Sequence, residues 1–184
     1  MLGRNGLDAP THCGAGISAI MVGDLTRLLH TSVLNYGVGG ELTSDGLPRI
    51  RQVVRLVHPS TVIILEGIND LWGGRSASDI AGNLFEMAKS CQASGARLII
   101  LTVLPVDRPV FPDAQSKVQA LDAAIRAIAH RQGVAVIDPS ARFHSHHPLS
   151  SLFRHVDGRE DGVHPNDTGY RLLAALVYQA LGHA

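Results

Sequence analysis

Short apolar runs rich in β-branched residues alternate along the chain with longer segments whose apolar positions recur every three or four residues. The short runs are "TSVLNYG" at 31–37, "TVIILEG" at 61–67, "ARLIILTV" at 96–103 and "GVAVID" at 133–138. The second and third are apolar on both faces, which is typical of parallel strands covered by helices. Helices are expected near 17–30, 45–58, 78–94, 115–131 and 166–181. This order predicts an α/β fold.

The helix expected near 78–94 has the clearest periodicity. Ile80, Leu84, Met87 and Cys91 are spaced by four, three and four residues, so they share one face of a helix. Ser78 is a suitable N-cap because its hydroxyl can accept from a free N–H of the first turn. We therefore expect this face to be buried against the sheet.

Length and charge narrow the function classes. The chain has 184 residues and 45% hydrophobic content, which predicts a single domain over 1–184. The 16 basic and 16 acidic residues leave no charged surface typical of binding to nucleic acid or an anionic membrane, so a small-molecule ligand is expected. The longest apolar run, "TVIILEGI", is too short to span a bilayer, and the start has no apolar signal core. These features predict a soluble, cytoplasmic protein whose oligomeric state the sequence leaves open.

Three polar motifs follow expected strands or precede the last helix, where ligand sites of parallel sheets form. They are "GVGGE" at 37–41, "EGINDLW" at 66–72 and "DGVHPNDTGY" at 161–170. Each motif alone has a plainer interpretation: a glycine turn, an Asn-Asp turn, and, for the third, either polar loop residues or half of a metal site. In this order, the three together resemble the SGNH hydrolases, also called the GDSL esterase and lipase family.

The resemblance implies a three-layer α/β/α sandwich with a parallel sheet, flavodoxin-like in its layers. It also implies an esterase that cleaves small carboxylic esters through an acyl-enzyme, without metal or organic cofactor. Matched motif by motif, Gly40 and Asn69 are expected to donate to the oxyanion, His164 to act as general base, and Asp161 to orient His164. Asp161 and His164 lie three residues apart, close enough for one tight loop to hold the imidazole against the carboxylate.

The family's nucleophilic serine, in a Gly-Asp-Ser block, is not found. Counting back from Gly40 places Gly3, Arg4 and Asn5 at that block, and an asparagine amide cannot act as the nucleophile. Residues 1–16 are therefore atypical, and the family's first strand is expected to be absent or truncated. We expect the native chain to begin upstream of Met1, which leaves open whether the protein is secreted. The alternative is a non-catalytic SGNH-like domain that binds an ester or acylated carbohydrate.

Other polar residues have less specific interpretations. Asp70 is expected to fix its loop by hydrogen bonds, and Glu66, placed inside a buried strand, to have a hydrogen-bonding partner. Ser18 and Ser32 lie too close to Gly40 in sequence to replace the missing serine. A nucleotide-binding function is disfavoured because no Lys or Ser/Thr follows the glycines in the manner of a P-loop. Three further residues are expected to lie in a solvated loop rather than to bind zinc: His144, His146 and His147.

Overall fold

The computed structural model describes residues 15–106, 113–156 and 159–182. By its internal contacts the chain divides into two compact units. One unit combines residues 1–40 with 165–184, and the other contains residues 41–164. The single domain expected over 1–184 stays a prediction.

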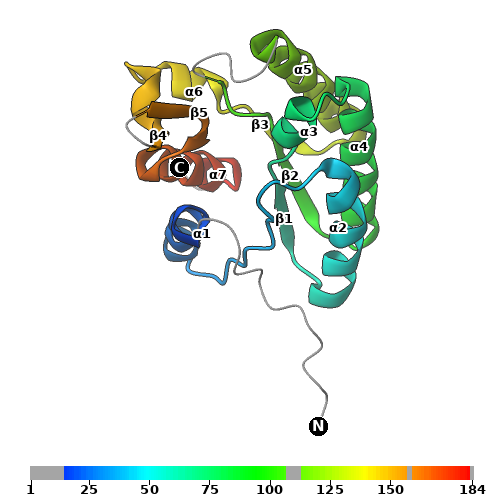
Figure 1. Ribbon diagram of the computed structural model, residues 1–184. Coiled ribbons are helices and arrows are strands. Elements are labelled where there is room, and N and C mark those ends of the chain that lie inside the picture. The colour runs from blue at the N-terminus through cyan, green and yellow to red at the C-terminus, as the bar shows by residue number, and fades with distance from the viewer. Residues whose placement is uncertain (1–14, 107–112, 157–158, 183–184) are drawn as a thin grey trace. The chain divides into compact units, whose positions relative to one another are not determined.

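The unit of residues 41–164 is built on a parallel sheet of three strands (Figure 1). The strands are β1 (Thr61–Ile64), β2 (Arg97–Leu101) and β3 (Ala135–Ile137), in the order β1-β2-β3. Val62 pairs with Leu98, and Ile100 pairs with Val136. Three of the four expected strands therefore form as predicted, in an α/β fold with a parallel sheet.

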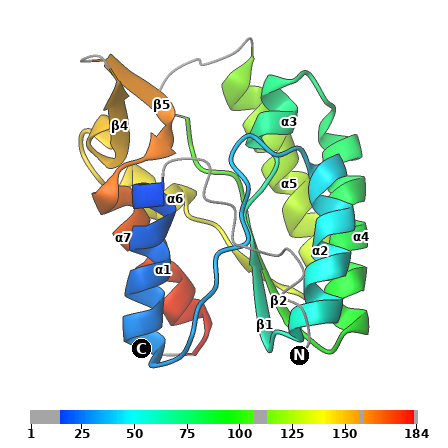
Figure 2. The same ribbon diagram turned by 60° about the horizontal axis from the view of Figure 1, so that its bottom comes forward.

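Helices connect these strands and lie against the sheet. The longer ones are α2 (Thr43–Val57), α4 (Ala77–Ala93) and α5 (Ala114–Gln132), and Figure 2 shows all three on one side of the sheet. The short helix α3 (Ile68–Trp72) follows β1 directly. After β3 the chain forms α6 (Ser140–His144), a 3-10 turn (Leu149–Leu152) and a two-stranded sheet of β4 (Phe153–Val156) and β5 (Arg159–Pro165).

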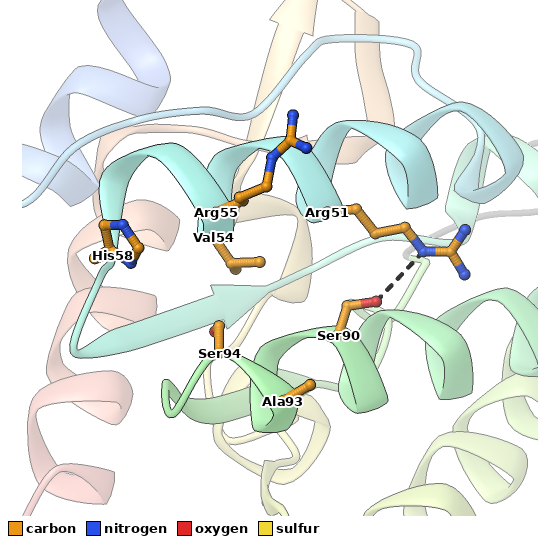
Figure 3. A pocket seen from close by; sticks show the side chains of 7 residues that line it. All are labelled: Arg51, Val54, Arg55, His58, Ser90, Ala93 and Ser94. Carbon is orange, nitrogen blue, oxygen red and sulfur yellow. Dashed lines mark hydrogen bonds between the residues drawn. The ribbon is translucent and has the colours of Figure 1, made fainter.

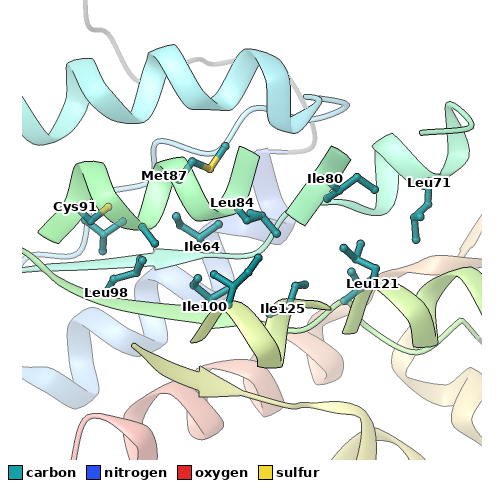
Figure 4. Packing of buried hydrophobic residues seen from close by; sticks show 14 of the residues in the cluster. Ile64, Leu71, Ile80, Leu84, Met87, Cys91, Leu98, Ile100, Leu121 and Ile125 are labelled. Atoms are coloured by element: carbon teal, nitrogen blue, oxygen red, sulfur yellow. The ribbon is translucent and has the colours of Figure 1, made fainter. Parts of the chain in front are cut away.

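The core of this unit lies between the sheet and α4 and α5 (Figure 4). The predicted apolar face of α4 is confirmed, because Ile80, Leu84, Met87 and Cys91 are all buried. Each buried aliphatic side chain of this size contributes about 1.5–3 kcal/mol through removal from water. Leu121 of α5 belongs to the same cluster. The helix periodicity thus determines how α4 meets the sheet.

The start of α4 differs from the prediction. Ser76, not Ser78, is the N-cap, and its hydroxyl accepts from the backbone N–H of Asp79 at 3.1 Å. The helix begins at Ala77, so Ser78 already lies in its first turn. The serine two residues earlier has the extended backbone that an N-cap needs, with ψ of 151°.

The other unit pairs α1 (Ala15–Leu29) with α7 (Asp167–Ala180), which lie side by side in both overall views. Arg171 of α7 forms an ion pair with Asp24 of α1 at 3.9 Å. Asn166 caps α7, since its side chain accepts from the backbone N–H groups of Thr168 and Gly169.

The strand expected at 31–37 does not form, which corrects the prediction. Residues 31–38 form neither strand nor helix, and Leu34 is 62% exposed. A β-branched run becomes a strand only when a neighbouring strand satisfies its backbone N–H and C=O groups. No strand among the described residues pairs with this segment. The side-chain pattern predicted a strand, but the backbone partner that a strand requires is not provided by the described part of the chain.

Candidate active site

Asp161 and His164 form a hydrogen-bonded pair on β5. Nδ1 of His164 lies 3.1 Å from Oδ2 of Asp161. The other carboxylate oxygen of Asp161 accepts from two backbone N–H groups, those of Val163 at 2.9 Å and His164 at 2.8 Å. The carboxylate is therefore fixed by the same loop that carries the imidazole. The structure brings these two predicted residues together as their spacing suggested.

The electrostatics of this pair favour an ionised Asp161. Partial burial raises the pKa of the Asp161 carboxyl, but the N–H groups of Val163 and His164 and the adjacent imidazole outweigh burial and lower it overall. An ionised carboxylate accepts the Nδ1 proton, which leaves the lone pair of His164 on Nε2. The His164 side chain is 62% exposed, so that nitrogen is on an accessible side chain. This arrangement suits a general base.

Asn69 lies on α3, and its side-chain amide is oriented by the segment that precedes α2. Nδ2 of Asn69 donates to the backbone carbonyl of Glu41 at 3.1 Å. An amide nitrogen carries two hydrogens, so one N–H fixes the orientation and the second is left for another acceptor. An N–H held in this way can donate to a developing negative oxygen without reorganising.

Asp70 ties the same two segments together. Its carboxylate accepts from the Thr43 backbone N–H at 2.9 Å and from the Thr43 hydroxyl at 2.7 Å. The Thr43 hydroxyl in turn accepts from Nδ2 of Asn83 at 3.0 Å. Both Asp70 and Thr43 are buried. The prediction that Asp70 fixes its loop by hydrogen bonds is confirmed.

Gly67 is the N-cap of α3 and has a conformation that only glycine adopts readily. Its φ is 118°, and a Cβ at this position would lie 2.8 Å from Cδ2 of the buried Leu121. A side chain here would therefore strain the backbone and collide with the core. Gly67 fixes the start of the helix that carries Asn69.

The sequence placed Glu66 inside a strand, but in the structure Glu66 follows β1, which ends at Ile64. Its Oε1 lies 3.6 Å from Nη2 of Arg49, while its Oε2 is buried without a hydrogen-bond partner among the described residues. Burial raises the pKa of Glu66 to about 7, with a further contribution from the nearby Glu41. The 3.6 Å contact of Oε1 with Arg49 is an ion pair and not a hydrogen bond, and a side-chain hydrogen bond with Glu41 also raises the pKa of Glu66.

Gly40 has a φ of 78°, the left-handed region that favours glycine. It belongs to the unit of residues 1–40 and 165–184, whereas Asn69, Asp161 and His164 belong to the other unit. Its role as an oxyanion donor stays a prediction. Residues 3–5, where counting back from Gly40 places the family's nucleophile block, lie outside the described residues.

Sequence reasoning missed Glu41, Arg49 and Thr43. Nε of Arg49 donates to Oε1 of Glu41 at 2.7 Å, and Nη2 contacts the other carboxylate oxygen. Glu41 ends the "GVGGE" motif, and its position beside the predicted oxyanion glycine was the available signal. Nothing in the sequence indicated that Arg49, eight residues later, would reach it.

The remaining candidates form no metal centre within the described ranges. No group of three His, Cys, Asp or Glu residues there is placed to hold a metal ion. His144 ends α6 and does not lie in the expected loop, and its Nδ1 is 2.8 Å from the Ser140 carbonyl oxygen one helical turn earlier. Within the same ranges, no helix is long and apolar enough to cross a membrane.

A surface hollow of about 480 Å³ lies between α2 and α4 (Figure 3). Arg51, Arg55 and His58 contribute its basic side chains, and Nε of Arg51 donates to the Ser90 hydroxyl at 3.5 Å. None of the predicted site residues lines this hollow. The candidate active site is therefore defined by its hydrogen-bonded side chains and not by this hollow.

Comparison with known families decides the assignment. The model of the GDSL-like lipase/acylhydrolase family matches residues 5–172. The chain belongs to this family. The predicted resemblance is thereby confirmed, and with it the assignment to a family of ester hydrolases.

Relatives of this GDSL-like protein include esterases and lipases. Esterase TesA of Pseudomonas aeruginosa is 31% identical over 94 residues, a match that spans 50% of this chain and 47% of TesA. Among solved structures, the lipase/acylhydrolase from Enterococcus faecalis has a TM-score of 0.76 at 22% identity, over 91% of this chain and 85% of that one. A GDSL-like lipase from Bacteroides thetaiotaomicron has a TM-score of 0.69 at 25% identity, over 89% and 81% of the two chains. The structural likeness confirms the predicted fold class.

Proposed function

We propose that this GDSL-like protein is a serine-type esterase that cleaves small carboxylic esters through an acyl-enzyme. The observation that carries the proposal is the Asp161–His164 pair, with 3.1 Å between Oδ2 and Nδ1 and the carboxylate fixed by two backbone N–H groups. His164 removes the proton of the attacking hydroxyl, and Asp161 holds the imidazole in the required tautomer.

The oxyanion of the tetrahedral intermediate is stabilised by N–H donors in this proposal. Asn69 supplies the amide hydrogen that Glu41 leaves free, and Gly40 supplies its backbone N–H. Removal of one such donor in a serine protease costs about 3–4 kcal/mol of transition-state stabilisation. No step of this chemistry involves a metal or an organic cofactor.

A fluorophosphonate probe and p-nitrophenyl acetate test the proposal on the full chain. The proposal expects covalent labelling and turnover, both lost in His164→Ala because the nucleophile is then not activated; since the Asn5 amide cannot attack, the labelled residue identifies the hydroxyl that does. Asp45→Asn is a suitable control, since Asp45 is exposed in the first turn of α2. Turnover that is unchanged in His164→Ala would refute the assignment of the base.

A second candidate function follows from Asn5, which stands where the family has its serine. With an amide at that position the domain binds an ester or acylated carbohydrate without cleaving it. This alternative predicts ligand binding with no covalent labelling, and labelling at any serine would exclude it. The double variant Arg4→Asp, Asn5→Ser recreates the Gly-Asp-Ser sequence, and gain of labelling in that variant alone would support the binding function for the unaltered chain.

A further inference from the structure

Three ionisable side chains form a partly buried cluster that is linked to the Asn69 amide through the Glu41 backbone carbonyl. The proposed chemistry uses none of these side chains. Glu41 precedes α2, Arg49 lies on α2, and Glu66 lies between β1 and α3. The side chains are 8%, 25% and 20% exposed, respectively. Two carboxyl groups therefore face one guanidinium in a site with little access to water.

Arg49 is bound mainly to Glu41. Its Nε donates to Oε1 of Glu41 at 2.7 Å, and its Nη2 contacts Oε2 of the same carboxylate. This two-point geometry is the strongest form of an arginine–carboxylate pair. Glu66 is more distant, with its Oε1 at 3.6 Å from Nη2 of Arg49. The guanidinium thus neutralises Glu41 and leaves Glu66 without a full counter-charge.

Glu66 is placed where an ionised carboxylate is unfavourable. Its Oε2 is buried and has no partner among the described residues. A Cβ added to Gly46 of α2 would lie 2.8 Å from that oxygen and 3.0 Å from the methyl carbon of Met87 on α4. The bare backbone of Gly46 and the Met87 methyl therefore lie close to this carboxyl, and a proton on it removes a charge that they cannot stabilise.

Burial is the largest cause of the raised pKa of Glu66. Repulsion from Glu41 and Asp70 and a side-chain hydrogen bond with Glu41 raise it further, whereas Arg49 lowers it. The pKa rises to about 7, so the neutral acid persists well above the usual range of a glutamate. Ionisation above that pH makes Glu66 a competitor of Glu41 for Arg49.

The cluster is connected to Asn69 through Glu41. The Glu41 side chain is held by Arg49, and its backbone carbonyl accepts from Nδ2 of Asn69 at 3.1 Å. A shift of Arg49 toward Glu66 releases the Glu41 side chain and changes the position of that carbonyl. The orientation of the Asn69 amide then changes with it.

We propose that Glu66 is a positioning residue: as a neutral acid it leaves Arg49 to Glu41, and Glu41 in turn holds the Asn69 amide in place. The inference rests on the proposed function only for the role of Asn69 as an oxyanion donor. Glu66 itself touches no substrate in this scheme. Its ionisation loosens the Asn69 amide and gives the site an upper pH limit.

Carboxyl NMR of the full chain tests the protonation of Glu66. With ¹³C-labelled glutamate, we expect one side-chain carboxyl to titrate with a midpoint near pH 7 and to disappear from the spectrum in Glu66→Gln. Glu86→Gln is the matched control, because Glu86 is an exposed helix residue paired with Lys89 at 3.0 Å. If every glutamate titrates below about pH 5.5, as unperturbed groups do, the proposal is wrong.

The side-chain amide signals of Asn69 test the coupling. We expect them to shift with the same midpoint near pH 7, to stay constant in Glu66→Gln, and to keep shifting in His164→Gln. The Nε signal of Arg49 in the unaltered protein should follow the same titration, which provides a measurement that needs no variant to fold. Constant Asn69 and Arg49 signals across a Glu66 titration would overturn the coupling. None of these measurements needs turnover, so a lack of esterase activity would count against the proposed function alone.

Discussion

Asp70 offers the sharpest test of how the Asn69 helix is held. Its carboxylate is 2% exposed and accepts from two donors of Thr43, the backbone N–H at 2.9 Å and the hydroxyl at 2.7 Å. Thr43 is fully buried and lies 27 residues away in the sequence. Removal of the carboxylate in Asp70→Ala leaves both donors of Thr43 without an acceptor and inaccessible to water.

The size of the effect follows from these two bonds. A hydrogen bond to a charged group contributes about 1.5–3 kcal/mol, and an unsatisfied buried donor costs about 1–3 kcal/mol. Two donors therefore predict a loss of about 3 kcal/mol or more in the free energy of unfolding for Asp70→Ala. Asp70→Asn keeps one acceptor oxygen and should lose about 1–2 kcal/mol, since the charge is removed but the amide still fits the site.

Urea unfolding followed by circular dichroism measures these losses. With a slope of about 2 kcal/mol per molar urea, the midpoint of Asp70→Ala should fall by about 1.5 M. Asp45→Asn, an exposed acid in the first turn of the same helix as Thr43, should change stability by less than about 0.5 kcal/mol. A loss below about 0.5 kcal/mol in Asp70→Ala, or an equal loss in the control, would refute the reasoning.

Three further predictions concern the same unit. Gly67→Ala should destabilise the fold by about 2 kcal/mol or more, because φ is 118° and the new methyl would lie 2.8 Å from Leu121. A thermal unfolding midpoint within about 1 °C of that of the unaltered protein would contradict this. Burial raises the pKa of Glu66 from 4.5 to about 7, so the folded state holds this proton more tightly than the unfolded chain. The free energies of unfolding of the unaltered protein and of Glu66→Gln should therefore be equal below about pH 4.5. As the pH rises through 7, the value for the unaltered protein should fall by up to roughly 3 kcal/mol relative to Glu66→Gln. A difference between the two proteins that stays constant in unfolding curves from about pH 4 to 8 would exclude this effect. Ile80→Ala should cost about 2–5 kcal/mol through a cavity in the core, whereas Ala81→Gly at the next residue of α4 serves as a propensity control of about 1 kcal/mol; equal losses in the two variants would argue against a cavity.

Hydrogen bonds from two other segments hold Asn69 and its helix in place. In the proposed reaction, Asn69 acts as a donor only if its amide is held before the charge develops. Here the backbone carbonyl of Glu41 orients the amide, and Asp70 ties the helix to Thr43. Loss of either contact should act on the site through geometry and leave the side chain of Asn69 intact.

Local patterns in the sequence were sufficient wherever the interacting groups are close along the chain. The buried face of α4 follows from a helical repeat of apolar residues, and the Asp161–His164 pair follows from a spacing of three residues on one loop. The cap of α7 by Asn166 is also local. In each case the backbone geometry of a few residues brings the groups together, whatever the rest of the chain does.

Contacts between distant segments were decided by the tertiary structure alone. The strand expected at 31–37 is absent because a strand depends on a backbone partner from elsewhere, which side-chain pattern does not report. The pairing of Asp70 with Thr43, and the cluster of Glu41, Arg49 and Glu66, join segments that the sequence gives no reason to connect. The sequence by itself determined the family, the α/β order and the local Asp161–His164 pair. Only the tertiary structure could place Glu66, a partly buried carboxyl group with little counter-charge, in the cluster linked to Asn69, since burial and counter-charge arise from residues that meet in space.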